Sequence, residues 1–168
     1  MNRLAVFLLG FALLLAGCKP AVKSKDITPL QRKQAASFDS EADFAATMKD
    51  LPRAEGLYKQ ATELCPDMPL YWENLGMTQR KMGNPKGARA AYGEALTLYG
   101  EHYRREKNPE DVLQQAWLLA LLGRDDEAAK LLQKARASHP NDTRVRQAAE
   151  PKWLETLHSN PAFKAIAL

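Results

Sequence analysis

The chain has 168 residues, of which 45% are apolar, 26% charged and 8% aromatic, and its formal net charge is +4. These values are typical of one compact globular domain, and they exclude collagen-like, disordered and polytopic membrane proteins. Alanine and leucine fill 50 positions whereas valine and isoleucine fill six, so the composition favours an all-α fold over a sheet.

The N-terminal segment reads as an export signal. An apolar run of 13 residues, 4–16, follows a single arginine. As a helix it would rise about 20 Å, less than the roughly 30 Å hydrocarbon core of a bilayer, so a cleaved signal is expected rather than a permanent span. The run ends in the letters LAGC at positions 15–18, which resemble the lipobox of bacterial lipoproteins.

The lipobox resemblance implies that residues 1–17 are removed and that the Cys18 sulfur receives a diacylglyceryl group, for which a thiolate nucleophile is suited. An ordinary signal peptide with an incidental cysteine is the alternative. Two or three acyl chains exceed the single-chain threshold for lasting membrane attachment. Lys19 stands where aspartate commonly retains lipoproteins in the inner membrane, so the resemblance implies the periplasmic face of the outer membrane of a bacterial cell envelope.

Residues 18–33 are predicted to be the lipidated cysteine and a flexible tether. The part after the cysteine, 19–33, contains two prolines, five basic residues and one acid, with no apolar period. Such a composition is typical of a solvated spacer.

Self-comparison of residues 34–142 reveals a period of 34 residues, because an Ala-x3-Tyr-x2-Ala pattern at 54–61 recurs at 88–95. Periods of this size indicate stacked helical hairpins. The middle hairpin, 69–108, resembles the tetratricopeptide repeat (TPR), with Gln79 and Gly100 in place of the usual tyrosine and proline. Its pattern residues are Trp72, Leu75, Gly76, Gly83, Ala88, Tyr92 and Ala95.

The two flanking hairpins depart further from the TPR pattern. In the third, 109–142, Val112 replaces the tryptophan, and the turn glycine comes 40 residues after Gly83, which predicts a longer helix or loop around 101–108. In the first, 35–68, Lys49 stands at the glycine position. Small residues let helices approach and larger ones fill the space between hairpins. The pattern residues of the third hairpin are Ala116, Leu119, Gly123, Ala128, Leu132, Ala135 and Pro140.

Residues 143–168 are predicted to form a helical cap over the last hairpin, which a solenoid needs. The stretch 143–150 has helical composition, and Pro151 interrupts or opens a helix. Asn160 followed by Pro161 is a good helix start. The fold expected from the TPR resemblance is therefore all-α: a short right-handed superhelix of three hairpins with a C-terminal cap.

The sequence offers no catalytic or metal-binding pattern. The three histidines lie in separate segments without ligand spacing, and no phosphate loop, HExxH or GxSxG motif occurs. The acids at 125–127 open a helix, where they complement its dipole. Cys65 ends a helix, which raises a thiol pKa, so an inert thiol is expected. We predict no enzyme activity, no cofactor and no metal.

By resemblance, TPR arrays bind extended peptides or helices in a groove lined by the first helix of each hairpin. Trp117 and Leu121 are the best anchors for a partner side chain there. The alternative is that they are covered by Trp153 or Phe163 of the tail. The groove candidates are Asp39, Asp43, Glu73, Met77, Arg80, Lys81, Leu113, Trp117 and Leu121.

One TPR subfamily binds acidic chaperone tails through a two-carboxylate clamp of lysine, asparagine and arginine. Of those positions this chain matches only Asn74, so binding of an acidic C-terminal peptide in that manner is not expected. The positions that differ are Asp39, Asp43, Glu110 and Gln114.

The combined expectation is a non-catalytic protein-binding adaptor or assembly factor, anchored by lipid and bound to other envelope proteins. The near-neutral charge argues against nucleic acid as a partner. Three repeats make a short groove, so a homodimer or a larger partner is expected to supply interface area. The alternatives are an envelope enzyme of the cell-wall hydrolase type, which a convergent polar cluster would favour, and a purely structural envelope subunit.

Overall fold

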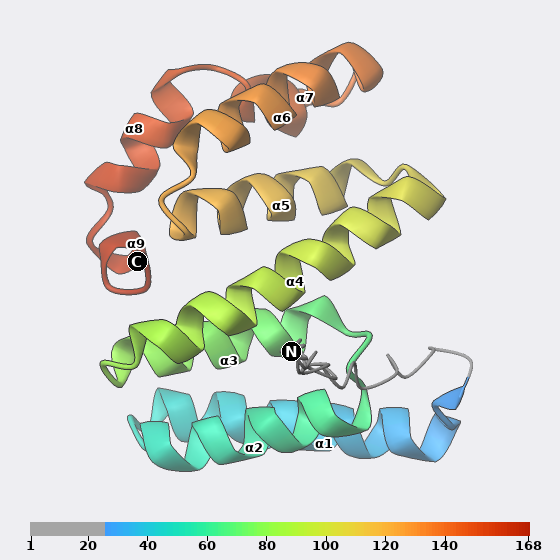
Figure 1. Cartoon of the computed structure of the whole chain (residues 1–168), viewed down its shortest axis with the longest axis vertical. Coiled ribbons are helices and arrows are strands. Elements are labelled where there is room, and N and C mark those ends of the chain that lie inside the picture. The colour runs from blue at the N-terminus through green and yellow to red at the C-terminus, as the bar shows by residue number, and fades with distance from the viewer. Residues whose placement is uncertain (1–25) are drawn as a thin grey trace, which may run out of the picture.

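The computed structural model describes residues 26–168, so the signal segment and Cys18 lie outside the described residues. Within this range three antiparallel helical hairpins stack in chain order (Figure 1). They are α1 (Pro29–Thr47) with α2 (Leu51–Leu64), α3 (Pro69–Lys81) with α4 (Pro85–Glu106), and α5 (Pro109–Leu121) with α6 (Asp125–Ser138). The tail forms α7 (Thr143–Ala148), α8 (Lys152–Ser159) and α9 (Pro161–Lys164).

The all-α prediction is confirmed for residues 26–168, since the described chain contains helices and turns and no strand. None of the helices in this range is both long and apolar enough to cross a membrane.

Most helices begin at a side-chain cap followed by a proline in the first turn, and both features are local to the sequence. Asp50, Asn84 and Asn108 each accept a hydrogen bond from a backbone N–H of the first turn. Proline there has no N–H to lose and a φ suited to a helix. The helix starts therefore follow from short sequence windows.

The start of α1 corrects the predicted tether. Thr28 and Gln31 form a capping box, so the helix begins at Pro29 and includes residues 29–33. The Arg32 guanidinium also pairs with Asp67, at 2.8 Å between Nη2 and Oδ2. The reason for the difference is that a capping box satisfies two backbone donors that a tether would leave to water.

All three hairpin turns have the same geometry. One residue in each has a positive φ, which is 63° at Lys49, 78° at Gly83 and 70° at Gly123. The next N–H then donates to a carbonyl five residues back, from Asp50 to Ala45 and at equivalent positions in the other turns. A lysine in this conformation costs about 1 kcal/mol more than glycine, yet the first hairpin closes in the same way.

Close helix crossings depend on small side chains. A Cβ on Gly76 would lie 2.5 Å from the Tyr92 ring, so α3 and α4 can approach this closely because Gly76 has no side chain. Trp72 packs beside this crossing, and its indole N–H donates to the Pro66 carbonyl at 2.9 Å. Several other small residues are fully buried, namely Ala42, Ala54, Ala61, Ala88, Ala95, Ala116 and Ala128.

The six extra residues between the second and third turns lengthen a helix rather than a loop. α4 continues through residue 106, for 22 residues, and ends at Lys107 with a φ of 56°. The extension projects beyond the start of α5, as Figure 1 shows.

The tail does more than cover the last hairpin. α9 lies beside the turn ends of α4 and α5, where the C-terminus also lies (Figure 1). The Tyr92 hydroxyl donates to the Ile166 carbonyl at 2.9 Å, and the Leu168 N–H donates to the Leu121 carbonyl at 2.8 Å. The chain end therefore returns from the third hairpin to the second.

Candidate binding groove

Equivalent positions of α1, α3 and α5 place one set of side chains along the first helices of the hairpins. We call this set the inner row. The two ends of the inner row differ in what covers them. α9 and the residues after it pack over one end, whereas α7 and α8 form only the wall of an open cleft at the other. Its members are Asp39, Asp43, Glu73, Met77, Leu113 and Trp117.

The end of the inner row near the hairpin turns is covered. Leu121 is fully buried beneath the tail. The Trp117 ring meets the Phe163 ring edge-on, with 5.0 Å between centroids and 74° between planes. Arg80 donates from Nε to the Ala167 carbonyl at 2.6 Å, whereas Lys81 is exposed.

Leu121 therefore does not offer its side chain to a partner in this structure, and the predicted anchor pair is corrected to Trp117 alone. The physical reason is that Phe163 and Ile166, both buried, fill the space over Leu121. Trp117 keeps a half-buried side chain that is shared between the tail and an open cleft.

The other end of the inner row opens into a cleft of about 510 Å³. Its floor comes from α3 and α5, and its wall comes from α7 and the start of α8. Two tryptophans and one buried acid line it, together with two glutamines and an arginine. The lining residues are Glu73, Leu113, Gln114, Trp117, Arg144, Gln147, Ala148 and Trp153.

Glu73 is the buried acid of this cleft, with 8% of its surface exposed. One carboxylate oxygen accepts a hydrogen bond from the Tyr99 hydroxyl at 3.3 Å. Burial raises the pKa of Glu73, and the hydrogen bond from Tyr99 opposes that shift in part. No ion pair to Glu73 is present within residues 26–168.

Asp39 and Asp43 continue this acidic character along α1. Asp39 accepts from the Asn74 amide at 3.2 Å, and Asp43 accepts from the Tyr58 hydroxyl. Burial raises the pKa of Asp39, which the hydrogen bond from Asn74 opposes. In the part of the chain that the structure describes, all three inner-row acids are thus hydrogen-bonded by neutral donors rather than paired with cations.

Arg144 brings a positive charge to the rim of the cleft, but that charge is balanced. Its guanidinium pairs with Glu110, and also with Asp142 at 3.3 Å between Nη2 and Oδ2. Both acids lie beside the cleft, at the starts of α5 and α7. The rim as a whole is therefore not basic.

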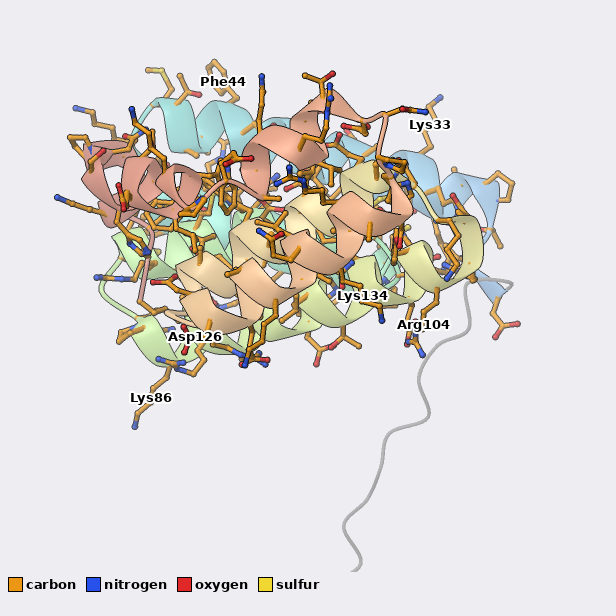
Figure 2. The ribbon with its side chains drawn as sticks, turned by 90° about the horizontal axis from the view of Figure 1, so that it is seen from above. Lys33, Phe44, Lys86, Arg104, Asp126 and Lys134 are labelled. Carbon is orange, nitrogen blue, oxygen red and sulfur yellow. The ribbon has the colours of Figure 1, made fainter. Side chains whose placement is uncertain are left out.

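A second cleft, of about 620 Å³, lies between the α4 extension, α5 and α6. Arg104, Lys107, Lys134 and His139 line it, and the Tyr103 hydroxyl bonds His139 Nε2 at 2.9 Å across it. Figure 2 shows Arg104 and Lys134 on the same side of the molecule. Sequence reasoning missed this cleft, although the 40-residue spacing was a signal for it.

The remaining candidate groups have structural surroundings. Cys65 is 1% exposed, and burial raises the pKa of its thiol, as expected for an inert cysteine. His158 lies 2.9 Å from Asp125 and edge-on to Phe163, so it ties α8 to α6 and α9. No group of three or more metal-ligating side chains occurs within residues 26–168.

Comparison with known proteins now adds to this geometry. A tetratricopeptide-repeat family model matches residues 69–102, and a second one matches residues 112–142. The chain therefore contains tetratricopeptide repeats in its second and third hairpins. None of the curated proteins matches it.

A solved TPR structure has the same fold. It is described as the first TPR of Spaghetti (RPAP3) bound to the HSP90 peptide SRMEEVD, and it aligns with a TM-score of 0.50 at 12% identity over 77% of this chain and 98% of that one. At this identity the likeness shows the fold alone. In the present chain Asn74, the one match to the two-carboxylate clamp, donates its amide to Asp39.

Proposed function

We propose that this TPR protein is a non-catalytic adaptor of the bacterial cell envelope that holds an extended segment of a partner protein against its inner row. The observation that carries the proposal is the cleft of about 510 Å³ at the uncovered end of that row. Aromatic side chains in such a position are typical anchors of protein interfaces, and Trp117 and Trp153 both line the cleft.

The anchoring part of the proposal rests on the LAGC letters at 15–18, which resemble a lipobox. A lipid on Cys18 would hold the protein on the periplasmic face of the outer membrane. α1 begins at Pro29, 11 positions later, so the start of α1 would stay within about 40 Å of the lipid even with the intervening residues fully extended.

The cleft by itself is small for a firm protein interface. Stable complexes bury roughly 800 Å² on each partner, and α9 already occupies the turn end of the inner row. A second contact surface, on a homodimer or on a large partner, would therefore complete the interface.

Site-specific photocrosslinking tests the adaptor role. A benzoylphenylalanine at Gln147, an exposed position lining the cleft, is expected to crosslink to a discrete envelope protein in intact cells. The same probe at Glu94, exposed on α4 and outside the cleft, is the matched control. Leu113→Trp, which fills the cleft, should abolish the crosslink. The same products from both positions, or none from Gln147, would contradict the proposal.

Metabolic labelling tests the anchor separately. Radiolabelled palmitate is expected on the wild-type chain and not on Cys18→Ser. That variant should also leave the membrane fraction. Absence of label on the wild-type chain would contradict the lipid anchor. It would not bear on the proposed binding groove.

A further inference from the structure

Resting on the adaptor function, we propose that the inner-row cleft binds the side chain of a lysine or arginine of the partner segment. Its positive charge would lie against Glu73, and its methylene groups would lie between Trp117 and Trp153. The cleft is thus proposed to bind basic segments, whereas the clamp subfamily binds acidic ones.

The first observation is the state of the Glu73 carboxylate. It is 8% exposed and lines the cleft, yet its one hydrogen bond within residues 26–168 comes from the neutral Tyr99 hydroxyl. A buried carboxylate without a cation is costly, whereas a well-placed cation turns that cost into binding energy. An incoming ammonium or guanidinium group supplies the missing charge.

The second observation is the composition of the walls. Trp117 and Trp153 line the same cleft as Glu73, and Leu113 and Ala148 add apolar surface. A cation over an indole ring is attracted by its π-electrons, and the stems of lysine and arginine pack on apolar surface. Aromatic and apolar walls around one acid thus fit an amphipathic basic side chain better than a neutral one.

The third observation is the charge along the approach. Asp39 and Asp43 extend the negative row from Glu73 along α1, with neutral donors as their partners. Of the two arginines beside the inner row, Arg144 pairs with two acids at the cleft rim, and Arg80 lies at the covered end, where it donates to the Ala167 carbonyl. A basic segment is therefore attracted along the inner row, and an acidic one is repelled.

The tryptophan indole signals provide a direct test. The full chain, labelled with 15N-tryptophan in neutral detergent micelles, is titrated with a short capped peptide of glycine, serine and lysine. Matched peptides replace lysine by norleucine or by glutamate. The lysine peptide is expected to shift the indole signals of Trp117 and Trp153 and to leave that of Trp72, which donates to Pro66 outside the cleft.

Variants then assign the effect. Glu73→Gln keeps an oxygen for the Tyr99 hydroxyl and removes the charge, so affinity for the lysine peptide should fall about tenfold. Trp153→Leu keeps apolar contact but removes an aromatic face, and a smaller loss is expected. Glu94→Gln, on the exposed side of α4, should bind as the wild type does. An unchanged Trp72 signal verifies folding in each variant.

Three outcomes would overturn the proposal: no shift with the lysine peptide, equal affinity for the norleucine peptide, or preference for the glutamate peptide. The adaptor function fails in a different way. If Gln147 crosslinks persist with full yield in Glu73→Gln, the groove binds a partner and the basic-side-chain assignment is wrong. If the wild-type crosslink is absent, the adaptor itself is rejected.

Discussion

The two ends of the inner row differ in how their side chains are buried and hydrogen-bonded. At the turn end, the tail supplies buried side chains and backbone groups, so that Leu121 is fully buried and the Ile166 carbonyl receives the Tyr92 hydroxyl. At the open end, Glu73 has one neutral donor, and Trp117 retains exposed surface.

The two ends of the inner row therefore differ in which groups are left to interact. At the covered end, side chains of the repeats donate hydrogen bonds to the last residues of the chain. Tyr92 donates to the Ile166 carbonyl, and Arg80 donates to the Ala167 carbonyl. At the open end, the Glu73 carboxylate has a neutral hydrogen-bond donor and no ion-pair partner within residues 26–168. The covered end contributes contacts to the fold, whereas the open end leaves a cleft uncovered.

Removing the Phe163 ring should have the largest effect on this comparison. Phe163 is 1% exposed and packs edge-on to Trp117 and His158. Phe163→Ala is expected to lower the free energy of unfolding by about 3–5 kcal/mol, because a cavity replaces the ring. Chemical denaturation measures the loss.

The matched control is Phe44→Ala. Phe44 is 64% exposed and projects from the surface (Figure 2), so its loss should change stability by less than about 0.5 kcal/mol. Equal effects of the two substitutions would mean that the tail does not hold the turn end closed.

Removing the Tyr92 hydroxyl should have an intermediate effect. Tyr92→Phe leaves the buried Ile166 carbonyl without its donor, which is expected to cost about 1–2 kcal/mol. Hydrogen exchange at the Leu168 amide should accelerate as the tail loosens. Tyr71→Phe is the control, since the Tyr71 hydroxyl makes no hydrogen bond within residues 26–168; a similar loss there would remove the special role of the tail contact.

The smallest effect is expected at the open end, and it depends on pH. Burial raises the pKa of Glu73 above its value in the unfolded chain, so the folded protein binds that proton more readily. Wild-type stability should therefore fall relative to Glu73→Gln as pH rises from the ordinary glutamate pKa through the raised one, and the difference should then stay constant.

Denaturation of wild type and Glu73→Gln across this pH range checks the prediction. Glu94→Gln controls for the loss of one negative charge at an exposed site. A Glu73→Gln variant less stable than the wild type at neutral pH would show that the open end already contains a favourable partner for the carboxylate.

Local patterns predicted the hairpins well because their determinants lie close together in the chain. The 34-residue period relates α2 to α4, and the turn position of Lys49 followed from alignment with Gly83. The third hairpin followed from its TPR-like residues, although its turn comes 40 residues after Gly83. The predicted tether was wrong for residues 29–33, which belong to α1. The proline and basic residues there indicated a spacer, and the Thr28–Gln31 capping box was not recognised. The longer spacing at 101–108 left a helix and a loop equally open.

The sequence by itself determined an all-α repeat, its turns and most helix starts, because caps, prolines and small residues act within a single hairpin. Only the tertiary structure decided which part of the inner row stays open. The contacts that close the turn end join Tyr92 to Ile166 across 74 positions and Arg80 to Ala167 across 87. The burial of Glu73 likewise depends on helices from different hairpins and the tail, whose packing no short window of sequence contains.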